Sequence, residues 1–79
     1  NIGEAVKERI LELYSERDIS INKLCSMSGV TQSTVNNIIS GRNRSATVST
    51  IKKLCDGLGI TIEDFFNSEL FRNLEQEIQ

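Results

Sequence analysis

The chain has 79 residues, two cysteines and a net charge of −2, and it contains no histidine, proline or tryptophan. A chain of this size forms one small domain with a thin core and has no room for two lobes around a catalytic cleft. Because histidine is the commonest metal ligand and the usual general base near neutral pH, its absence argues against most metal sites and most enzymes. We therefore expect no catalytic residues, no metal and no cofactor.

The two cysteines, Cys25 and Cys55, are far apart in the sequence and form no Cys-x-x-Cys pair. They are expected to be small buried thiols in a reducing compartment. No apolar run approaches the roughly 20 residues that a membrane-spanning helix needs, and no signal-peptide pattern is present. These observations predict a cytoplasmic protein without membrane contacts.

Charge is unevenly distributed along the chain. Residues 1–18 carry a net charge of −2, residues 19–55 carry +5 with no acidic residue, and residues 56–79 carry −5. The cations of the central segment are Lys23, Arg42, Arg44, Lys52 and Lys53. A segment without carboxylates presents a positive face even in a mildly acidic protein, which favours a polyanionic partner.

Apolar residues recur at helical spacing almost throughout the chain, and no alternating strand pattern competes. The first helix is expected over about residues 3–17. Its buried face is predicted to consist of Val6, Ile10, Leu13 and Tyr14. Its solvated face is predicted to consist of Glu4, Glu8, Glu12 and Glu16.

Two short helices are expected next, over about residues 21–28 and 32–40. Ser20 and Thr31 precede them as N-caps, because a hydroxyl accepts a hydrogen bond from a free amide of the first turn. Gly29 is expected to end the first of these helices in the left-handed conformation, which glycine adopts without a Cβ penalty.

A fourth helix is expected over residues 48–58, between an N-cap at Thr47 and a stop at Gly59. Its inner face is predicted to consist of Val48, Ile51, Leu54 and Leu58. Gly57 lies inside this helix at a cost of about 1 kcal/mol relative to alanine, and nothing in the local sequence accounts for it.

The last third of the sequence predicts a short fifth helix and a helical tail. Thr61 and Asp64 match a capping box at the start of the fifth helix. One more helix is expected over residues 68–78, with Leu70, Phe71, Leu74 and Ile78 on one side. The predicted fold class is therefore all-α, with five compact helices in residues 1–66 and a helical extension in residues 67–79.

The segment from 21 to 40 has the pattern of a helix-turn-helix, in which two short helices are joined by a turn that contains glycine. Cys25 supplies the small residue that is needed where the helices cross, and Gly29 supplies the positive φ of the turn. The inward-facing positions are Leu24, Val30, Val35 and Ile38.

The outward face of the helix at 32–40 carries neutral side chains that both donate and accept hydrogen bonds. With Thr31 at its start, this face consists of Gln32, Ser33, Asn36, Asn37 and Ser40. Base edges in the major groove present the same mixture of donors and acceptors. An ordinary solvated face would instead carry Glu and Lys, which are better helix formers. The pattern favours DNA base readout by these six residues over a merely polar surface.

Over about residues 3–66 the chain resembles the lambda-repressor-like (Cro/cI-type, XRE) helix-turn-helix transcriptional regulators. The matching residues are Leu24, the run from Gly29 to Val35, the run from Ile38 to Arg42 and the run from Thr50 to Thr61. The resemblance implies a lambda-repressor-like fold and regulation of transcription, most often repression by a homodimer on a near-palindromic double-stranded operator. Cys25 departs from the family, which usually has alanine there. Ile21 departs too, because it cannot make the phosphate hydrogen bond that a polar residue often makes at its position.

Other polar residues are placed to contact DNA phosphates, which position a protein on the duplex without reading its sequence. These are Arg42, Asn43, Arg44 and Ser45, which follow the reading helix, and Ser20 and Asn22 at the positive end of the preceding helix. Lys52 and Lys53 either steer the encounter with DNA or are ordinary solvated lysines.

The apolar side of the predicted tail helix needs a partner, because a stripe of that length is rarely left in water. Either Leu70, Phe71, Leu74 and Ile78 form an isologous homodimer contact, or they fold back on their own domain. The homodimer is favoured, since a two-fold dimer doubles the contacts on half-sites about 34 Å apart.

The acidic last third and the apolar tail leave one alternative function open. The chain would then be a protein-interaction module, such as an antitoxin-like partner, with secondary DNA binding.

Overall fold

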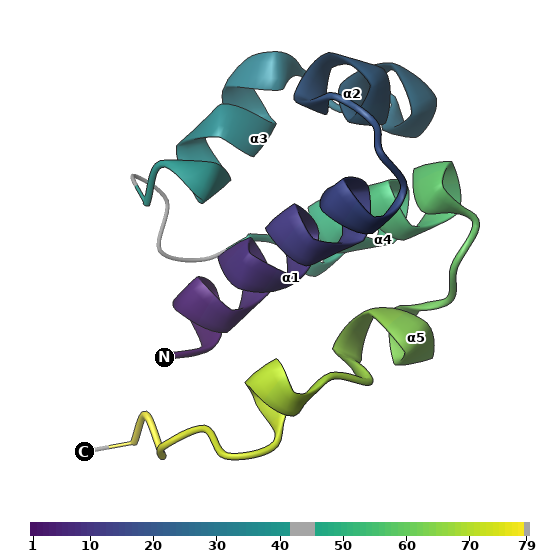
Figure 1. Cartoon of the computed structure of the whole chain (residues 1–79). Helices are drawn as coiled ribbons and strands as arrows, with labels where there is room; N and C mark the ends of the chain where they lie inside the picture. Colours follow the sequence, from purple (N-terminus) through teal and green to yellow (C-terminus); the bar gives the residue numbers. More distant parts are fainter. Residues whose placement is uncertain (42–45, 79) are drawn as a thin grey trace.

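The computed structural model describes residues 1–41 and 46–78. These residues form only helices: α1 (Ile2–Glu16), α2 (Ile21–Ser28), α3 (Gln32–Ile39), α4 (Val48–Leu58), α5 (Ile62–Phe66) and one 3₁₀ turn, η1 (Glu69–Phe71) (Figure 1). The all-α prediction is confirmed. The ends of α1 to α4 lie within one residue of those expected from the sequence.

Local sequence signals set the ends of the helices. The hydroxyls of Ser20, Thr31, Thr47 and Thr61 each accept a hydrogen bond from the backbone N–H three residues later. The capping box predicted at Thr61 and Asp64 is present. Gly29 has a φ of +67°, so α2 ends in the left-handed conformation that the turn to α3 requires.

The core is one cluster of buried apolar side chains to which all five α-helices contribute. α2 packs most extensively against α4, and α3 packs against both α1 and α2. Figure 1 shows the α2–α3 unit on one side of α1 and α4, with α5 and the C-terminal residues on the other side. The inward positions predicted for this unit, Leu24, Val30, Val35 and Ile38, are all buried. The α2–α3 unit is thus fixed to the rest of the domain through its apolar faces.

Gly57 of α4 lies close against the end of α2. A Cβ at this position would lie 2.2 Å from Ser28 Oγ and 2.9 Å from Ser28 Cα. No side chain fits there unless α2 moves, because real Cβ atoms essentially never come so close to another atom. Glycine at this position lowers the intrinsic stability of α4, but it allows α4 to pack closely against the helix-turn-helix unit.

Arg9 joins α1 to the end of α5. Only 12% of its side chain is exposed. Its Nε donates to the carbonyl oxygen of Phe65 at 2.6 Å, and its Nη2 donates to that of Asp64 at 2.8 Å. Nη1 pairs with Glu12 at 2.5 Å. Arg9 thereby donates to two carbonyls at the end of α5; that of Asp64 also accepts from the Asn67 N–H at 3.3 Å.

Two expectations from the sequence are wrong. Val48 was expected on the inner face of α4 but is 73% exposed, because it is the first residue of the helix and the buried face begins one turn later at Ile51. The helix expected over residues 68–78 is not formed; beyond η1, residues 72–78 contain no helix. A helix that short is marginal in water unless packing supports it.

The first part of the tail instead packs against the rest of the domain. η1 contacts α1, and the ring of Phe71 lies 4.8 Å from Phe66 and 6.2 Å from Phe65, measured between centroids. Leu74 is 36% exposed and Ile78 is 85% exposed. Phe71 therefore folds back on its own domain, whereas Leu74 and Ile78 of the apolar stripe remain at the surface.

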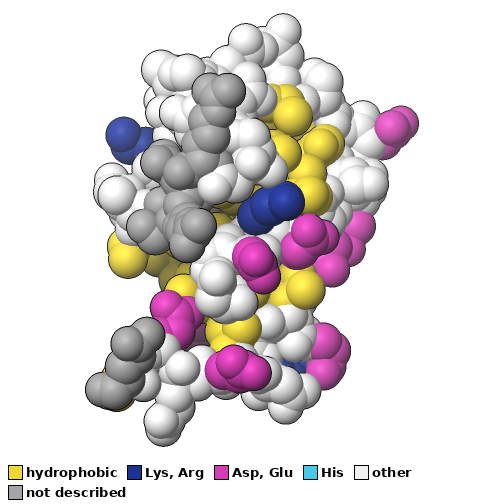
Figure 2. Space-filling model, turned by 90° about the vertical axis from the view of Figure 1, so that its left-hand side faces the viewer, with side chains coloured by type: hydrophobic (Ala, Val, Ile, Leu, Met, Phe, Trp, Pro, Cys, Tyr) yellow, Lys and Arg dark blue, Asp and Glu magenta, His cyan; other side chains and the backbone are white. Residues whose placement is uncertain are grey.

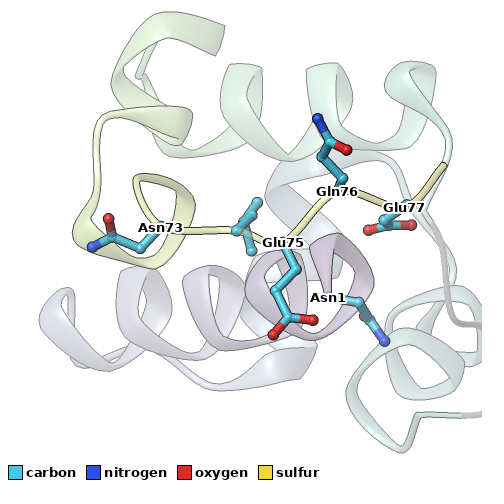
Figure 3. A pocket seen from close by; sticks show the side chains of 6 residues that line it. Asn1, Asn73, Glu75, Gln76 and Glu77 are labelled. Carbon is cyan, nitrogen blue, oxygen red and sulfur yellow. The ribbon is translucent and has the colours of Figure 1, made fainter. Parts of the chain in front are cut away.

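The end of the tail lies beside the start of α1. The backbone N–H of Ile2 donates to Glu77 Oε2 at 2.9 Å. Asn1 and the tail residues from 73 to 77 surround a pocket of about 380 Å³, around which Figure 3 shows the carboxylates of Glu75 and Glu77. This end of the molecule is acidic and polar.

None of the described helices is both long enough and apolar enough to cross a membrane.

Candidate nucleic-acid interface

The outward face of α3 is polar and uncharged. Gln32, Ser33 and Asn36 are exposed along it. On the opposite face, Val35 is completely buried and Ile38 is 3% exposed. The buried side chains fix the rotation of α3 about its own axis, so the polar side chains are held toward solvent.

The remaining predicted base-reading residues lie at the margins of this face. Thr31 is exposed, but its hydroxyl accepts from the Thr34 N–H at 3.3 Å as the N-cap of α3. Ser40 is exposed, and its hydroxyl donates to the carbonyl oxygen of Asn37 at 3.3 Å. Asn37 is half-buried. Gln32 and Asn36 are thus the two fully exposed amide side chains of this face.

A shallow groove of about 410 Å³ is lined by α2, the turn that follows it and the first residue of α3. Asn22 and Gln32 line it from opposite helices, and Nε2 of Gln32 donates a hydrogen bond to Oδ1 of Asn22. Both residues were predicted to contact DNA, but the contact between them was not predicted. They are separated by a turn and lie on different helices, so no periodicity in the sequence connects them.

The predicted phosphate-contacting residues of α2 lie at its exposed start. Ser20 Oγ accepts from the Lys23 N–H at 3.1 Å, which leaves the hydroxyl proton of Ser20 available to donate. Asn22 is exposed, and so is Lys23, a cation that is not among the residues predicted to contact DNA. Arg42, Asn43, Arg44 and Ser45 lie outside the described residues.

Charged side chains are unevenly distributed over the described part of the molecule. Residues 19–41 contain one cation, Lys23, and no acidic residue. The four glutamates expected on the solvated face of α1 are exposed, as are the acids of α5 and the tail. In Figure 2 the acidic side chains gather toward the lower and right-hand parts of the view, whereas the upper part, formed by α2 and α3, is mostly uncharged. A polyanion is therefore repelled least from the α2–α3 side.

The two thiols are buried, as predicted. Burial raises the pKa of both the Cys25 and the Cys55 thiol, which keeps them protonated near neutral pH. They act as small apolar groups in the core rather than as reactive or metal-binding thiolates. Within residues 1–41 and 46–78, no three His, Cys, Asp or Glu side chains are grouped so that they could hold a metal ion.

Comparison with known proteins identifies the domain. The family model described as a Cro/C1-type HTH DNA-binding domain matches residues 9–69, which include the whole α2–α3 unit. The crystal structure of prophage Lp1 protein 11 is similar, with 36% sequence identity and a TM-score of 0.81, over 94% of this chain and 97% of that one. No curated protein matches the sequence. The lambda-repressor-like fold is confirmed, and the chain belongs to the Cro/C1-type helix-turn-helix DNA-binding domain family.

Proposed function

We propose that the protein is a sequence-specific transcriptional repressor that reads the major groove of double-stranded DNA with α3. The observation that carries this proposal is the neutral polar face of α3, which buried Val35 and Ile38 hold outward on the least acidic side of the molecule. The major groove is about 12 Å wide and admits an α-helix, whose amide and hydroxyl groups then meet base edges. Occupation of a promoter by such a domain blocks transcription.

Base readout is assigned to the exposed side chains of α3. Gln32, Ser33 and Asn36 contact base edges, with Thr31 and Ser40 at the two ends of the surface and Asn37 at its half-buried margin. Glutamine and asparagine each form two hydrogen bonds with adenine. Serine can both donate and accept, so it can bond to more than one kind of base. Gln32 and Asn36 are one turn apart on α3 and are therefore assigned to neighbouring base pairs.

Replacing Gln32 with alanine tests the readout. We expect Gln32→Ala to relax discrimination at one base pair and to weaken binding to the preferred duplex by about 1–3 kcal/mol, with little change on unrelated DNA. The preferred duplex is selected from a random DNA pool, and affinities are measured by fluorescence anisotropy. Asn73→Ala, an exposed amide deletion in the tail, is the matched control. If specific and non-specific affinity fall together, Gln32 does not read a base.

Phosphate contacts are assigned to Ser20, Asn22, Arg42, Asn43, Arg44 and Ser45. Arg42→Ala and Arg44→Ala are each expected to weaken binding to all sequences about equally, because phosphates carry no sequence information. Each lost contact should reduce the slope of log K against log salt concentration by about 0.9, measured in a salt titration with the preferred and an unrelated duplex. A slope that stays unchanged in both variants would remove these arginines from the interface.

The proposal includes a homodimer on a near-palindromic operator, with the contact made by the apolar residues of the tail, Leu70, Phe71, Leu74 and Ile78. Leu74 and Ile78 are exposed, whereas Phe71 packs on its own domain. We therefore expect Leu74→Asp with Ile78→Asp to produce a monomer that melts like the wild type, because the aromatic packing of Phe71 is kept. Sedimentation of both proteins measures this, and a wild-type chain that is monomeric at high micromolar concentration without DNA would contradict the dimer.

A second candidate function is a protein-interaction module, such as an antitoxin-like partner, with secondary DNA binding. It is supported by the exposed apolar side chains of α5 and the tail, which include Ile62 and Phe66, each 37% exposed. Selection from random DNA tests the two functions, because a repressor enriches a preferred duplex, whereas an interaction module without specific DNA contacts enriches none.

A further inference from the structure

The last residues of the tail have no partners for their backbone groups within the domain. Residues 72–78 contain neither helix nor strand, and residues 73–78 make no backbone hydrogen bond to any residue of 1–41 or 46–78. The tail is nevertheless held beside α1, because Glu77 accepts from the Ile2 N–H at 2.9 Å. Residues 74–78 thus resemble the edge strand of a sheet, whose unpaired N–H and C=O groups are a template for another strand.

Side chains of this segment lie alternately on two sides of it. Figure 3 shows Glu75 and Gln76 pointing to opposite sides of the chain. Glu77 reaches the start of α1, whereas the next residue, Ile78, is 85% exposed. In an extended segment every second residue shares a face. Leu74, Gln76 and Ile78 therefore form one face, and Glu75 and Glu77 form the other.

The order of residue types in this segment is the same in both directions. Leu74, Glu75, Gln76, Glu77 and Ile78 run from apolar through acidic to amide, and then through acidic to apolar again. When two copies pair in antiparallel fashion with Gln76 opposite itself, Leu74 of each copy lies opposite Ile78 of the other. The ribbon then has two apolar cross-strand pairs on one face, and between them two amides that both donate and accept hydrogen bonds.

We propose that residues 74–78 of two copies form an antiparallel two-stranded ribbon with its two-fold axis at Gln76, an inference that rests on the homodimer of the proposed function. The contact is isologous, so it closes after two copies and does not continue into a filament. In Figure 1 the tail ends near the start of α1, on the far side of α1 from the α2–α3 unit. A ribbon there leaves the outward face of α3 uncovered.

The acidic face of the ribbon gives the dimer a characteristic response to salt. Glu75 of each copy lies opposite Glu77 of the other, and like charges directly opposite one another destabilise a strand pair. Salt screens this repulsion, so the dimer should become tighter as the salt concentration rises. Sedimentation of the full chain without DNA at low and high salt measures the response. A dimer that dissociates as salt is added would contradict the pairing of Glu75 with Glu77.

Disulfide formation tests the register of the ribbon in the full chain. Cα atoms of directly opposite residues are about 4.5–5.5 Å apart, which a disulfide spans, so Gln76→Cys should give a disulfide-linked dimer under mild oxidation. Leu74→Cys alone should not, because its two copies are four positions apart along the ribbon, about 13 Å. An equal mixture of Leu74→Cys and Ile78→Cys should cross-link, since these positions lie opposite each other. The wild type is the control, because its own two thiols are buried.

Two prolines test whether the backbone groups make the contact. Glu75→Pro with Gln76→Pro keeps Leu74 and Ile78 but removes two successive N–H groups, one of which faces the partner strand. Neither N–H has a backbone partner among the described residues, so this variant should melt like the wild type but sediment as a monomer. Glu75→Ala with Gln76→Ala keeps both N–H groups and is the matched control, which should remain dimeric.

The outcomes separate the ribbon from the rest of the proposed function. If the wild type is dimeric, equal cross-linking of Gln76→Cys and Leu74→Cys would overturn the ribbon but leave the homodimer standing. A dimeric double-proline variant would do the same. A wild type that is monomeric at high micromolar concentration would remove the homodimer and the ribbon together. Base reading by α3 is unaffected by any of these results, because Gln32→Ala tests it separately.

Discussion

Replacing Phe65 with alanine is expected to lower the stability of the domain by about 3–5 kcal/mol, the usual cost of removing a large buried aromatic side chain. Phe65 is completely buried, is the largest such side chain and contacts both Phe66 and Phe71. Domains of this size are stabilised by only about 5–10 kcal/mol in total. The melting temperature should fall by at least about 12 °C, since each kcal/mol shifts it by roughly 4–8 °C.

The adjacent residue provides the control for this prediction. Phe66→Ala makes the same chemical change at a side chain that is 37% exposed, so we expect it to cost much less. Circular dichroism melting of the two variants measures the difference. Equal melting temperatures would mean that α5 is not anchored in the core through Phe65.

A carboxylate at the centre of the α3 face is expected to abolish most DNA binding. Asn36→Asp keeps the size of the side chain but places a negative charge against the duplex, where juxtaposition of like charges costs several kcal/mol. We expect affinity for every sequence to fall about thirtyfold or more, corresponding to at least about 2 kcal/mol. Fluorescence anisotropy with the preferred and an unrelated duplex measures the loss.

Two further variants separate the charge from the lost hydrogen bonds. Asn36→Ala removes the amide without adding charge and should weaken mainly the preferred duplex. Asn73→Asp makes the same change as Asn36→Asp in the exposed tail, on the acidic side of the molecule, and should bind almost like the wild type. Similar losses in Asn36→Asp and Asn73→Asp would show that α3 does not lie against the DNA.

The parts of the fold that the sequence predicts well are those set by local chemistry. Hydroxyl N-caps at Ser20, Thr31 and Thr47 and the left-handed glycine at Gly29 act within one turn of the chain, so they mark the helix ends without knowledge of tertiary structure. The helical period likewise identifies buried faces, and every inward position predicted for the α2–α3 unit is buried.

The features that the sequence does not predict depend on contacts between distant residues. Gly57 makes sense only once Ser28 of α2 lies against it. The tail has a helical apolar pattern, but packing of Phe71 on the domain overrides that pattern.

The candidate site, like the fold, is only partly predictable from the sequence. Composition and spacing identify the exposed polar residues of α3, because a neutral face of poor helix formers is unusual on a solvated helix. They do not show that Asn37 is half-buried or that Asn22 bonds to Gln32. Both facts depend on how α3 packs against the rest of the domain, which the order of the residues alone does not specify.

The measurement that tests major-groove reading by α3 most directly replaces single purines in the preferred duplex with deaza analogues. A 7-deazapurine lacks the N7 acceptor in the major groove, whereas a 3-deazapurine lacks the N3 acceptor in the minor groove. We expect 7-deaza substitution at the purine read by Gln32 to weaken wild-type binding but to leave Gln32→Ala unaffected, and we expect 3-deaza substitution there to change neither. Loss of affinity with the 3-deaza analogue alone, or an equal 7-deaza effect on both proteins, would contradict major-groove reading by α3.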